Sequence, residues 1–563
     1  MMPVISVQLP ELERLLGSPP PRETLLAQLP LMGCDIDHVE GDELAVEFFP
    51  NRPDCYSVEG IARALRCYLG LGTPTVHFAV SAPTVSLKVH PSVVPLRPHI
   101  VCGIARNLHL DDPTITSLIG LQEKLDLTLG RQRAKVSIGL HDLRSLSPPF
   151  EYKAVGRDFS FAPLSALGPE GPTHEQEIAT ILREHPKGVA YAHLLPKRGP
   201  VPIILDSQRR VLSMPPIING THSAVTARTT DLFLDITGTD GTAVAAALNV
   251  MMTMLLERGG VLEAVTIVRP DGSLVAPDLR PRAAVVAVDQ ACALLGVPLD
   301  AAQVAQCLAR MGHEAKPAAN GRTVQVATPA YRVDFLHAVD WLEEVAIGYG
   351  FDRFGGSLPT AQTFGRPLPL RLVDSRARIG ALGMGFTEMV GFTLSNDLEQ
   401  YGTSGLPPPN PTRISNPTSD EQTLLRTSLL PGLLGQLRLN RQNDLPQRIF
   451  EVGDVVIDHR NVRALGLVWI ASKVGWSDIK GVGQRLLQDL GVDAQMIARE
   501  RAGFIVGRVG ILLTADHREV GVLGEIHPAM LEAFGLAAPT VALELRLEGT
   551  VEPEGVGALP SAA

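Results

Sequence analysis

The chain has 563 residues, of which 45% are hydrophobic and 20% charged, and its formal net charge is −10. This length predicts about three to five domains, and the apolar fraction excludes an intrinsically disordered chain. Negative charge argues against indiscriminate coating of nucleic acid, although a local basic patch can still bind RNA. No stretch reads as a membrane helix or a secretory signal, and the 6 cysteines form no C-x-x-C pair. We therefore expect a cytoplasmic, multidomain protein with reduced thiols and no membrane association.

The first 80 residues predict a small N-terminal domain. Residues 3–7 alternate like a strand, residues 11–16 have helical periodicity, and residues 44–49 form a second strand that ends at a Pro-Asn-Arg-Pro-Asp turn. A helix follows, with Ser57 as its expected N-cap. Pro and Gly residues between 72 and 83 place a boundary near residue 80.

Three further domains are expected after residue 80. Residues 81–272 predict a mixed α/β domain with strands at 85–89, 100–105, 201–205 and 232–236 and helices at 115–129 and 243–257. Residues 273–355 follow a Pro-rich linker and predict a winged-helix-like unit with helices at 288–295, 301–311 and 335–349 and a strand at 323–327. Residues 360–550 predict a mixed antiparallel sheet with long strands such as 541–547, and residues 551–563 a disordered tail.

The string DFLHAVDWLEE (residues 334–344) carries four carboxylates on or beside one predicted helix. Asp340, Glu343 and Glu344 are three and four positions apart, so they project from the side opposite the apolar stripe. Asp334 lies just before the first turn. With no Lys or Arg between them, these carboxylates repel one another unless a hard cation binds there. Spacing alone favours the alternative, a solvated acidic face with a capping residue.

Other polar residues are weaker candidates. The basic run 131–135 either contacts phosphate or forms a solvated turn. Four polar residues interrupt two apolar segments, at Ser213, Asn219, Asp235 and Thr237. In a pocket they would position a water or read a substrate hydroxyl; otherwise they are hydrogen-bonded turn residues. The adjacent pair His141–Asp142 does not by itself indicate catalytic geometry, and no P-loop, G-x-S-x-G or H-E-x-x-H motif occurs.

Several strings resemble the phenylalanine–tRNA ligase beta-subunit family and occur in that family's order. They are FFPNRPDCYSVEGIARAL (48–65), SIGLHDL (137–143), EHPKG (184–188), YAHL (191–194), NPTSDE (416–421), LRTSLLPGLL (425–434) and GEIHP (524–528). Two more, MPPIING (214–220) and LFLDITGTD (232–240), are similar to its archaeal and eukaryotic-type branch. The resemblance runs from Pro3 to about Leu547 and thus covers nearly the whole chain.

The resemblance implies an α+β multidomain fold with an N-terminal domain, an editing domain, a winged-helix-like domain and a class II synthetase-like domain. It implies a ligase that charges tRNA(Phe) with L-phenylalanine, using ATP, as an alpha2beta2 heterotetramer with an alpha subunit. It also implies that Asp334, Asp340, Glu343 and Glu344 bind Mg²⁺ in a site shared with that subunit. The resemblance therefore reverses the preference for a solvated acidic face.

The same resemblance assigns the two enzymatic roles. The 81–272 domain is expected to hydrolyse mischarged Tyr-tRNA(Phe): Asp235 accepts the phenol proton, Ser213 or Thr237 orients water, and Asn219 binds substrate. A working class II module holds ATP phosphates with arginines in F-R-x-E and G-x-G-x-x-x-R strings. The nearest strings here, RIFE (448–451) and GRVG (507–510), do not fit. The synthetic active site is therefore expected on the alpha subunit.

Two alternatives stay open at this point. A stand-alone deacylase of mischarged tRNA would use the 81–272 domain, but it would not need residues 360–550. A non-catalytic scaffold would keep the folds and lose both editing and metal binding, but the four carboxylates are intact.

Overall fold

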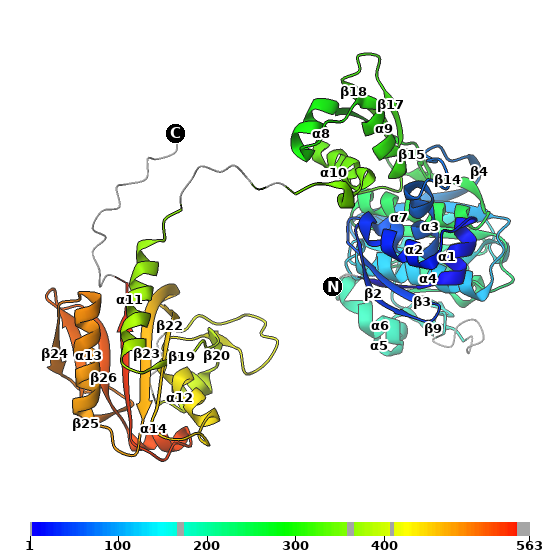
Figure 1. Cartoon of the computed structure of the whole chain (residues 1–563). Helices are drawn as coiled ribbons and strands as arrows, with labels where there is room; N and C mark the ends of the chain where they lie inside the picture. The colour runs from blue at the N-terminus through cyan, green and yellow to red at the C-terminus, as the bar shows by residue number, and fades with distance from the viewer. Residues whose placement is uncertain (1–2, 166–173, 357, 359–364, 406–409, 549–563) are drawn as a thin grey trace. The chain divides into compact units, whose positions relative to one another are not determined.

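The computed structural model describes residues 3–165, 174–356, 358, 365–405 and 410–548, so the expected tail at 551–563 lies outside the described residues. The chain divides into two compact units, Met1–Ser357 and Leu358–Ala563 (Figure 1). This division falls between the predicted domains 273–355 and 360–550. Within the described ranges, no helix is long and apolar enough to cross a membrane.

The N-terminal part of the first unit is a three-stranded antiparallel sheet with helices. The strands, in the order β1-β3-β2, are β1 (Val4–Gln8), β3 (Glu43–Phe48) and β2 (Cys34–Glu40). The helices are α1 (Leu9–Leu16), α2 (Arg22–Gln28) and α3 (Val58–Tyr68). The Ser57 hydroxyl accepts a 3.3 Å hydrogen bond from the Gly60 N–H, so Ser57 is the N-cap of α3 as predicted.

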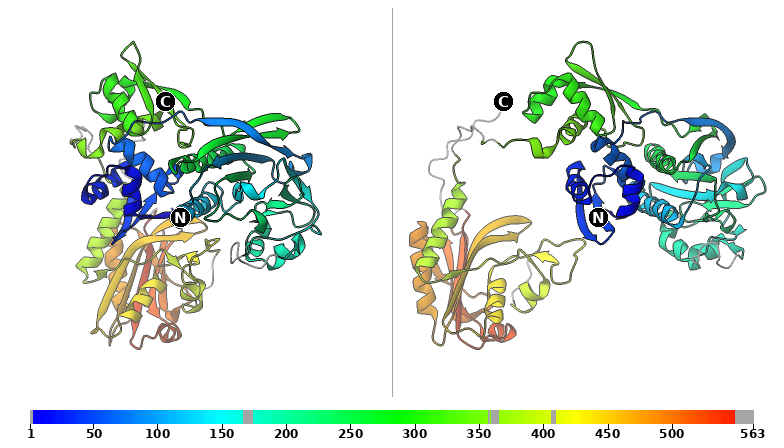
Figure 2. Two further views of the ribbon diagram at one scale, coloured as in Figure 1. Left: turned by 90° about the vertical axis from the view of Figure 1, so that its right-hand side faces the viewer. Right: turned by 45° about the vertical axis from the view of Figure 1, so that its right-hand side comes forward.

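A ten-stranded sheet forms the centre of the first unit (Figure 2). Its strand order is β12-β11-β10-β7-β4-β14-β5-β13-β6, and β15 also pairs with β14. The strands are β4 (Val80–Val89), β5 (His99–Arg106), β6 (Val136–Asp142), β7 (Phe150–Val155), β10 (Val201–Leu205), β11 (Val211–Met214), β12 (Ile218–Asn219), β13 (Leu232–Gly238), β14 (Val261–Arg269) and β15 (Gly272–Ala276). A separate pair is β8 (Ser160–Phe161) and β9 (Gln176–Glu177), and the helices are α4 (Asp112–Leu127), α5 (Ile178–Glu184), α6 (Pro186–Tyr191) and α7 (Gly241–Glu257).

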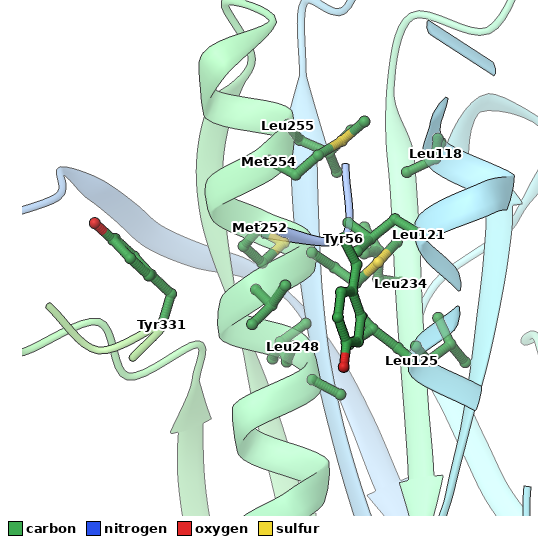
Figure 3. Packing of buried hydrophobic residues seen from close by; sticks show 14 of the residues in the cluster. Tyr56, Leu118, Leu121, Leu125, Leu234, Leu248, Met252, Met254, Leu255 and Tyr331 are labelled. Carbon is green, nitrogen blue, oxygen red and sulfur yellow. The ribbon is translucent and has the colours of Figure 1, made fainter. Parts of the chain in front are cut away.

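The N-terminal part and the large sheet share one hydrophobic core. Tyr56, which precedes α3, lies between α7 and α4 and is 1% exposed (Figure 3). The predicted boundary at residue 80 coincides with the start of β4, but it does not separate two cores. The predicted boundary at 272 is wrong in detail, because β15 continues the large sheet to Ala276 as a hairpin with β14.

The end of the first unit is a small α/β module. Its sheet has the order β16-β18-β17, formed by β16 (Arg282–Ala287), β18 (Thr323–Thr328) and β17 (Glu314–Pro317). Its helices are α8 (Val288–Leu295), α9 (Ala301–Arg310) and α10 (Ala338–Tyr349). The sequence predicted the three helices and β18, but it missed β16 and β17. Helix α10 begins three residues later than predicted, because His337 caps it and Phe335 lies in the preceding segment.

The second unit is a seven-stranded sheet with helices on both faces (Figure 1). The strand order is β19-β22-β23-β27-β26-β25-β24, with β19 (Thr387–Glu388), β22 (Gln447–Ile457), β23 (Arg460–Ile470), β27 (Thr540–Arg546), β26 (Glu519–Ile526), β25 (Phe504–Thr514) and β24 (Ala494–Ala498). A short pair is β20 (Leu394–Ser395) and β21 (Leu424–Leu425). Helices α11 (Pro369–Gly383) and α13 (Trp476–Leu490) pack on one face, and α12 (Leu430–Leu439) and α14 (Pro528–Ala533) on the other. Only β19 pairs in parallel among these strands, so the predicted mixed sheet is confirmed.

Candidate functional site

The first candidate site is a cavity of about 410 Å³ in the large-sheet part of the first unit. Strands β6, β11 and β13, helix α4 and the segment around Pro215 and Pro216 contribute its walls. Asp235 lies in the middle of β13, a strand buried along its whole length, and pairs with Gly139 of β6. A buried carboxylate is thus placed in the wall of a cavity that also has polar strand residues, Ser137, Ser213 and Asn219.

Asp235 is held from behind by two donors. Its Oδ2 atom lies 2.7 Å from His141 Nε2 and accepts a 3.2 Å hydrogen bond from the Ser213 hydroxyl. The other imidazole nitrogen, Nδ1, lies 2.8 Å from the hydroxyl of Ser223. All four side chains are buried, and the sequence did not indicate the role of His141.

Gly139 makes room for this arrangement. A Cβ atom at position 139 would lie 2.2 Å from Asp235 Oδ2 and 2.9 Å from His141 Nε2. Contacts this short are not tolerated, so any larger residue would displace the carboxylate or the imidazole.

Three of the four predicted pocket residues come together and one does not. Ser213, Asn219 and Asp235 all line the cavity, and Asn219 Nδ2 donates to the Leu140 carbonyl at 3.2 Å. Thr237 is fully buried outside the lining, where its hydroxyl accepts a 2.9 Å hydrogen bond from Arg97 Nε. The expected role of Thr237 in orienting water is therefore not supported by its position.

Basic groups lie at the rim and floor of the cavity. Arg133 donates to the carbonyls of Pro216 and Ile217 and forms a 3.0 Å ion pair with Asp126. Lys187 also lines the cavity. Burial raises the pKa of Asp126 to about 6, although the Arg133 charge opposes this rise. Within the basic run at 131–135, Arg133 is thus a structural wall residue rather than part of a solvated turn.

The second candidate site is the acidic segment at α10, and it contains a cation that the sequence analysis did not count. Arg332 Nη2 lies 2.7 Å from Asp334 and 2.8 Å from Glu344, and the Arg332 side chain is 2% exposed. His313 Nε2 lies 3.0 Å from Glu344. The expectation of four uncompensated carboxylates is therefore wrong for Asp334 and Glu344.

The other two carboxylates, Asp340 and Glu343, form no ion pair with a Lys, Arg or His of the described residues. Asp340 Oδ2 accepts hydrogen bonds of 2.6 Å from the backbone N–H groups of Leu336 and His337, so Asp340 completes the capping box of α10, whose N-cap is His337 and not Asp334. Glu343 is exposed. Partial burial, followed by repulsion from Glu344, Asp340 and Asp334, raises the pKa of Glu343. This shift indicates negative charge around Glu343 that Arg332 does not fully neutralise.

A magnesium ion fits these residues only in part. Among the described residues, no group of three or more His, Cys, Asp and Glu side chains is arranged to hold a metal ion. Mg²⁺ usually keeps several waters and takes one or two carboxylates from a protein, so Asp340 and Glu343 are the residues that suit it. A complete site needs further ligands from outside this chain or from water.

The segment before α10 is tied to the N-terminal part through buried charges. The Arg63 guanidinium stacks over the Tyr331 ring, with its Cζ atom 4.0 Å from the ring centroid. Burial opposes ionisation of Asp54, but the nearby charges of Arg52 and Arg332 outweigh it and lower the pKa of Asp54 to about 2. The N-R-P-D string at 51–54 therefore has a structural role beside Arg332.

In the second unit, the arginines nearest to nucleotide-binding strings are already engaged. Arg448 donates to the Met384 carbonyl at 3.1 Å and stacks on Trp469 at 3.9 Å. Arg508 forms a 2.7 Å ion pair with Glu525. Arg448 is therefore held by backbone and ring contacts, whereas the Arg508 side chain is 59% exposed and forms its ion pair at the surface.

Comparisons with known proteins agree over nearly the whole chain. Residues 285–351 match the family "tRNA synthetase B5 domain", and residues 356–547 match "Phenylalanyl tRNA synthetase beta chain CLM domain". The phenylalanine–tRNA ligase beta subunit of Archaeoglobus fulgidus is 40% identical over 549 residues, which cover 97% of this chain and 98% of that protein. The corresponding subunit of Methanothrix thermoacetophila is 40% identical over 97% of this chain and 100% of its own length.

A solved structure agrees with the fold of the first unit. The N-terminal fragment of the phenylalanyl-tRNA synthetase beta subunit from Pyrococcus horikoshii superimposes with a TM-score of 0.59 at 35% identity. The matched residues make up 62% of this chain and 99% of that fragment. With relatives of 40% identity matched along nearly their full length, the chain belongs to the phenylalanine–tRNA ligase beta-subunit family.

Proposed function

We propose that this chain supports the charging of tRNA(Phe) with L-phenylalanine by an alpha subunit, which carries the synthetic active site, in an alpha2beta2 assembly. The observation that carries this proposal is that RIFE (448–451) and GRVG (507–510) do not fit the arginine strings of a working class II module, because ATP activation needs guanidiniums that face the phosphates. ATP is then a substrate of the complex and not a ligand of this chain.

An exposed apolar surface supports the need for a partner. On α11, Leu372, Ile379 and Leu382 are 50%, 70% and 53% exposed and lie on one side of the helix. Val390 and Phe392, shortly after the helix, are 89% and 83% exposed. Clustered apolar side chains of this kind are typical of protein interfaces, so we assign this surface to the alpha subunit.

Replacing Ile379 by glutamate is expected to abolish co-purification with the alpha subunit, because a charge would be buried without a partner in the interface. The test is co-expression with a tagged alpha chain, followed by size-exclusion chromatography. Val506→Glu is the matched control, since Val506 is 69% exposed on β25 of the same unit. Equal recovery of Ile379→Glu and wild type would remove α11 from the interface.

We further propose that Mg²⁺ binds at Asp340 and Glu343, with Asp334 and Glu344 nearby and the remaining ligands from the alpha subunit or water. The geometry supports this assignment: Asp340 and Glu343 lie three positions apart on α10, and Asp340 is bonded to backbone N–H groups while Glu343 is exposed. A bound divalent cation would offset the repulsion and hold the subunit contact together.

Asp340→Asn combined with Glu343→Gln is expected to weaken assembly with the alpha subunit in magnesium to the level that wild type shows in excess chelator. Sedimentation velocity in both buffers measures the effect, with Glu314→Gln, a change to a partly exposed carboxylate of the same module, as the control. If the double variant and wild type assemble equally well in chelator and in magnesium, the acidic face is only solvated.

The cavity at Asp235 favours a second activity, the hydrolysis of mischarged Tyr-tRNA(Phe). Its volume of about 410 Å³ is within the range of roughly 300–1,000 Å³ that is usual for small-ligand pockets. An apolar site rejects an added hydroxyl by only about 100-fold, so a ligase for phenylalanine benefits from a second site that reads the tyrosine hydroxyl. Asp235 is the acceptor for that hydroxyl, and Lys187 at the rim suits a phosphate of the tRNA end.

The remaining pocket residues receive roles that follow from their contacts. Ser213 donates its proton to Asp235 and keeps oxygen lone pairs that can accept from a water. Asn219 uses its Nδ2 group on Leu140, which leaves its amide oxygen for the substrate. The match to beta subunits along nearly their full length argues against a stand-alone deacylase. The cavity lined by Ser213, Asn219 and Asp235 argues against a non-catalytic scaffold.

A further inference from the structure

A line of hydrogen bonds runs from the interior of the first unit to the cavity wall. Ser223 Oγ lies 2.8 Å from His141 Nδ1, and His141 Nε2 lies 2.7 Å from Asp235 Oδ2. His141 and Ser223 are fully buried, and Asp235 is 1% exposed. His141 does not line the cavity, so it acts on a ligand there only through Asp235.

The contacts assign the imidazole proton to one nitrogen when Asp235 is ionised and His141 is neutral. An ionised carboxylate only accepts hydrogen bonds, so a neutral His141 must donate from Nε2 and accept at Nδ1. Ser223 must then donate to Nδ1 at 2.8 Å in preference to the Gly220 carbonyl at 3.3 Å. The proton positions follow from this network of donors and acceptors.

Both donors reach the same oxygen of Asp235. His141 and the Ser213 hydroxyl bond to Oδ2, and no hydrogen bond joins Oδ1 to any residue in the described part of the chain. Gly139 leaves space beside the bonded oxygen, since a Cβ atom there would meet Oδ2 at 2.2 Å and His141 Nε2 at 2.9 Å. The carboxylate is therefore fixed in one rotation, with Oδ1 free for a donor in the cavity.

We infer that His141, held in its Nε2–H tautomer by Ser223, is a positioning residue that fixes Asp235 for recognition of a phenolic hydroxyl. The inference rests on the proposed hydrolysis of Tyr-tRNA(Phe) and assigns its selectivity to this pair. A fixed oxygen that only accepts suits a tyrosyl ester, whose phenol donates, and gives nothing to a phenylalanyl ester.

The experiment uses the full chain assembled with its alpha subunit and compares His141→Leu, His141→Gln and Ser223→Ala with wild type. His141→Leu is expected to raise KM for deacylation of tyrosyl-tRNA by about 10- to 100-fold, with kcat within about threefold, because a hydrogen bond to a charged group is lost from ground state and transition state alike. His141→Gln keeps an N–H donor and is expected to restore most of the loss. His222→Gln, at a neighbouring imidazole that does not contact Asp235, is the matched control.

A second readout does not depend on hydrolysis. Nitrogen NMR of the histidine-labelled chain is expected to show the Nε2–H tautomer for His141, identified by loss of its signals in His141→Gln, and Ser223→Ala is expected to alter those signals. An Nδ1–H tautomer, or an unchanged KM in His141→Leu, overturns the inference. If wild type does not hydrolyse tyrosyl-tRNA, the assigned substrate and the proposed editing activity are both wrong, while the tautomer result still decides whether Ser223 holds His141.

Discussion

Replacing Asp235 by alanine is expected to lower kcat/KM for deacylation of tyrosyl-tRNA by the assembled ligase by about 100-fold or more. The carboxylate is 1% exposed and lies in the cavity wall with its Oδ1 atom available. In the proposed mechanism, its loss removes the acceptor for the tyrosine hydroxyl from a buried position, where single polar groups have large effects.

Thr237→Val is the comparison variant, because it changes a buried residue of the same strand that does not line the cavity. The Thr237 hydroxyl contacts Arg97 and not the cavity, so its removal is expected to change kcat/KM by less than about threefold. Circular dichroism and thermal unfolding confirm that both variants are folded. If folded Asp235→Ala hydrolyses tyrosyl-tRNA at the wild-type rate, the pocket lies elsewhere.

Replacing Arg332 by methionine is expected to reduce the free energy of unfolding of the first unit by about 3–5 kcal/mol. The guanidinium is 2% exposed and pairs with Asp334 and Glu344. Removing it leaves the Glu344 carboxylate buried with only His313 beside it, and an uncompensated buried charge costs more than the ion pair contributes. Urea unfolding in excess chelator measures the change, since chelator prevents a divalent cation from replacing the arginine.

Two further variants test the cause of this loss. Combining Arg332→Met with Glu344→Gln is expected to recover much of the stability, because the buried charge is removed together with its partner. Arg280→Met is the surface control: Arg280 pairs with Asp278 on the exterior and is expected to contribute nothing measurable. An Arg332→Met chain as stable as wild type would show that the buried pairs carry no stability.

Periodicity predicted elements well where one local signal dominates. Helix α8 has the predicted bounds, and β10 is observed over the predicted residues, because each has a regular apolar pattern and clear end signals. Strands β16 and β17 were missed, since their sequences, RAAVVA and EAKP, do not alternate between apolar and polar residues. The predicted start of α10 was three residues too early, because its N-cap is His337 and not one of the usual Ser, Thr, Asp or Asn residues.

Site residues could be predicted only where they differ in polarity from the residues next to them in the sequence. Asp235 interrupts an apolar strand, and that local contrast identified it. His141 reaches Asp235 and Ser223 across 94 and 82 residues, so no spacing rule could reveal its partners. Because side chains alternate along a strand, Thr237 is on the same face of β13 as Asp235. It lies two residues farther along the strand, however, where its hydroxyl contacts Arg97. Arg332 was not predicted as a partner of these carboxylates, because it lies outside the acidic string at 334–344.

The central claim is that this chain takes part in charging without activating phenylalanine itself. The most direct test measures phenylalanine-dependent ATP–pyrophosphate exchange and charging of tRNA(Phe), with the purified chain alone and after reconstitution with its alpha subunit. The account predicts no exchange by the chain alone, since RIFE (448–451) and GRVG (507–510) do not fit the arginine strings that hold ATP phosphates, and it predicts both activities in the complex. Exchange by the isolated chain, or failure of the reconstituted complex to charge tRNA(Phe), would contradict it.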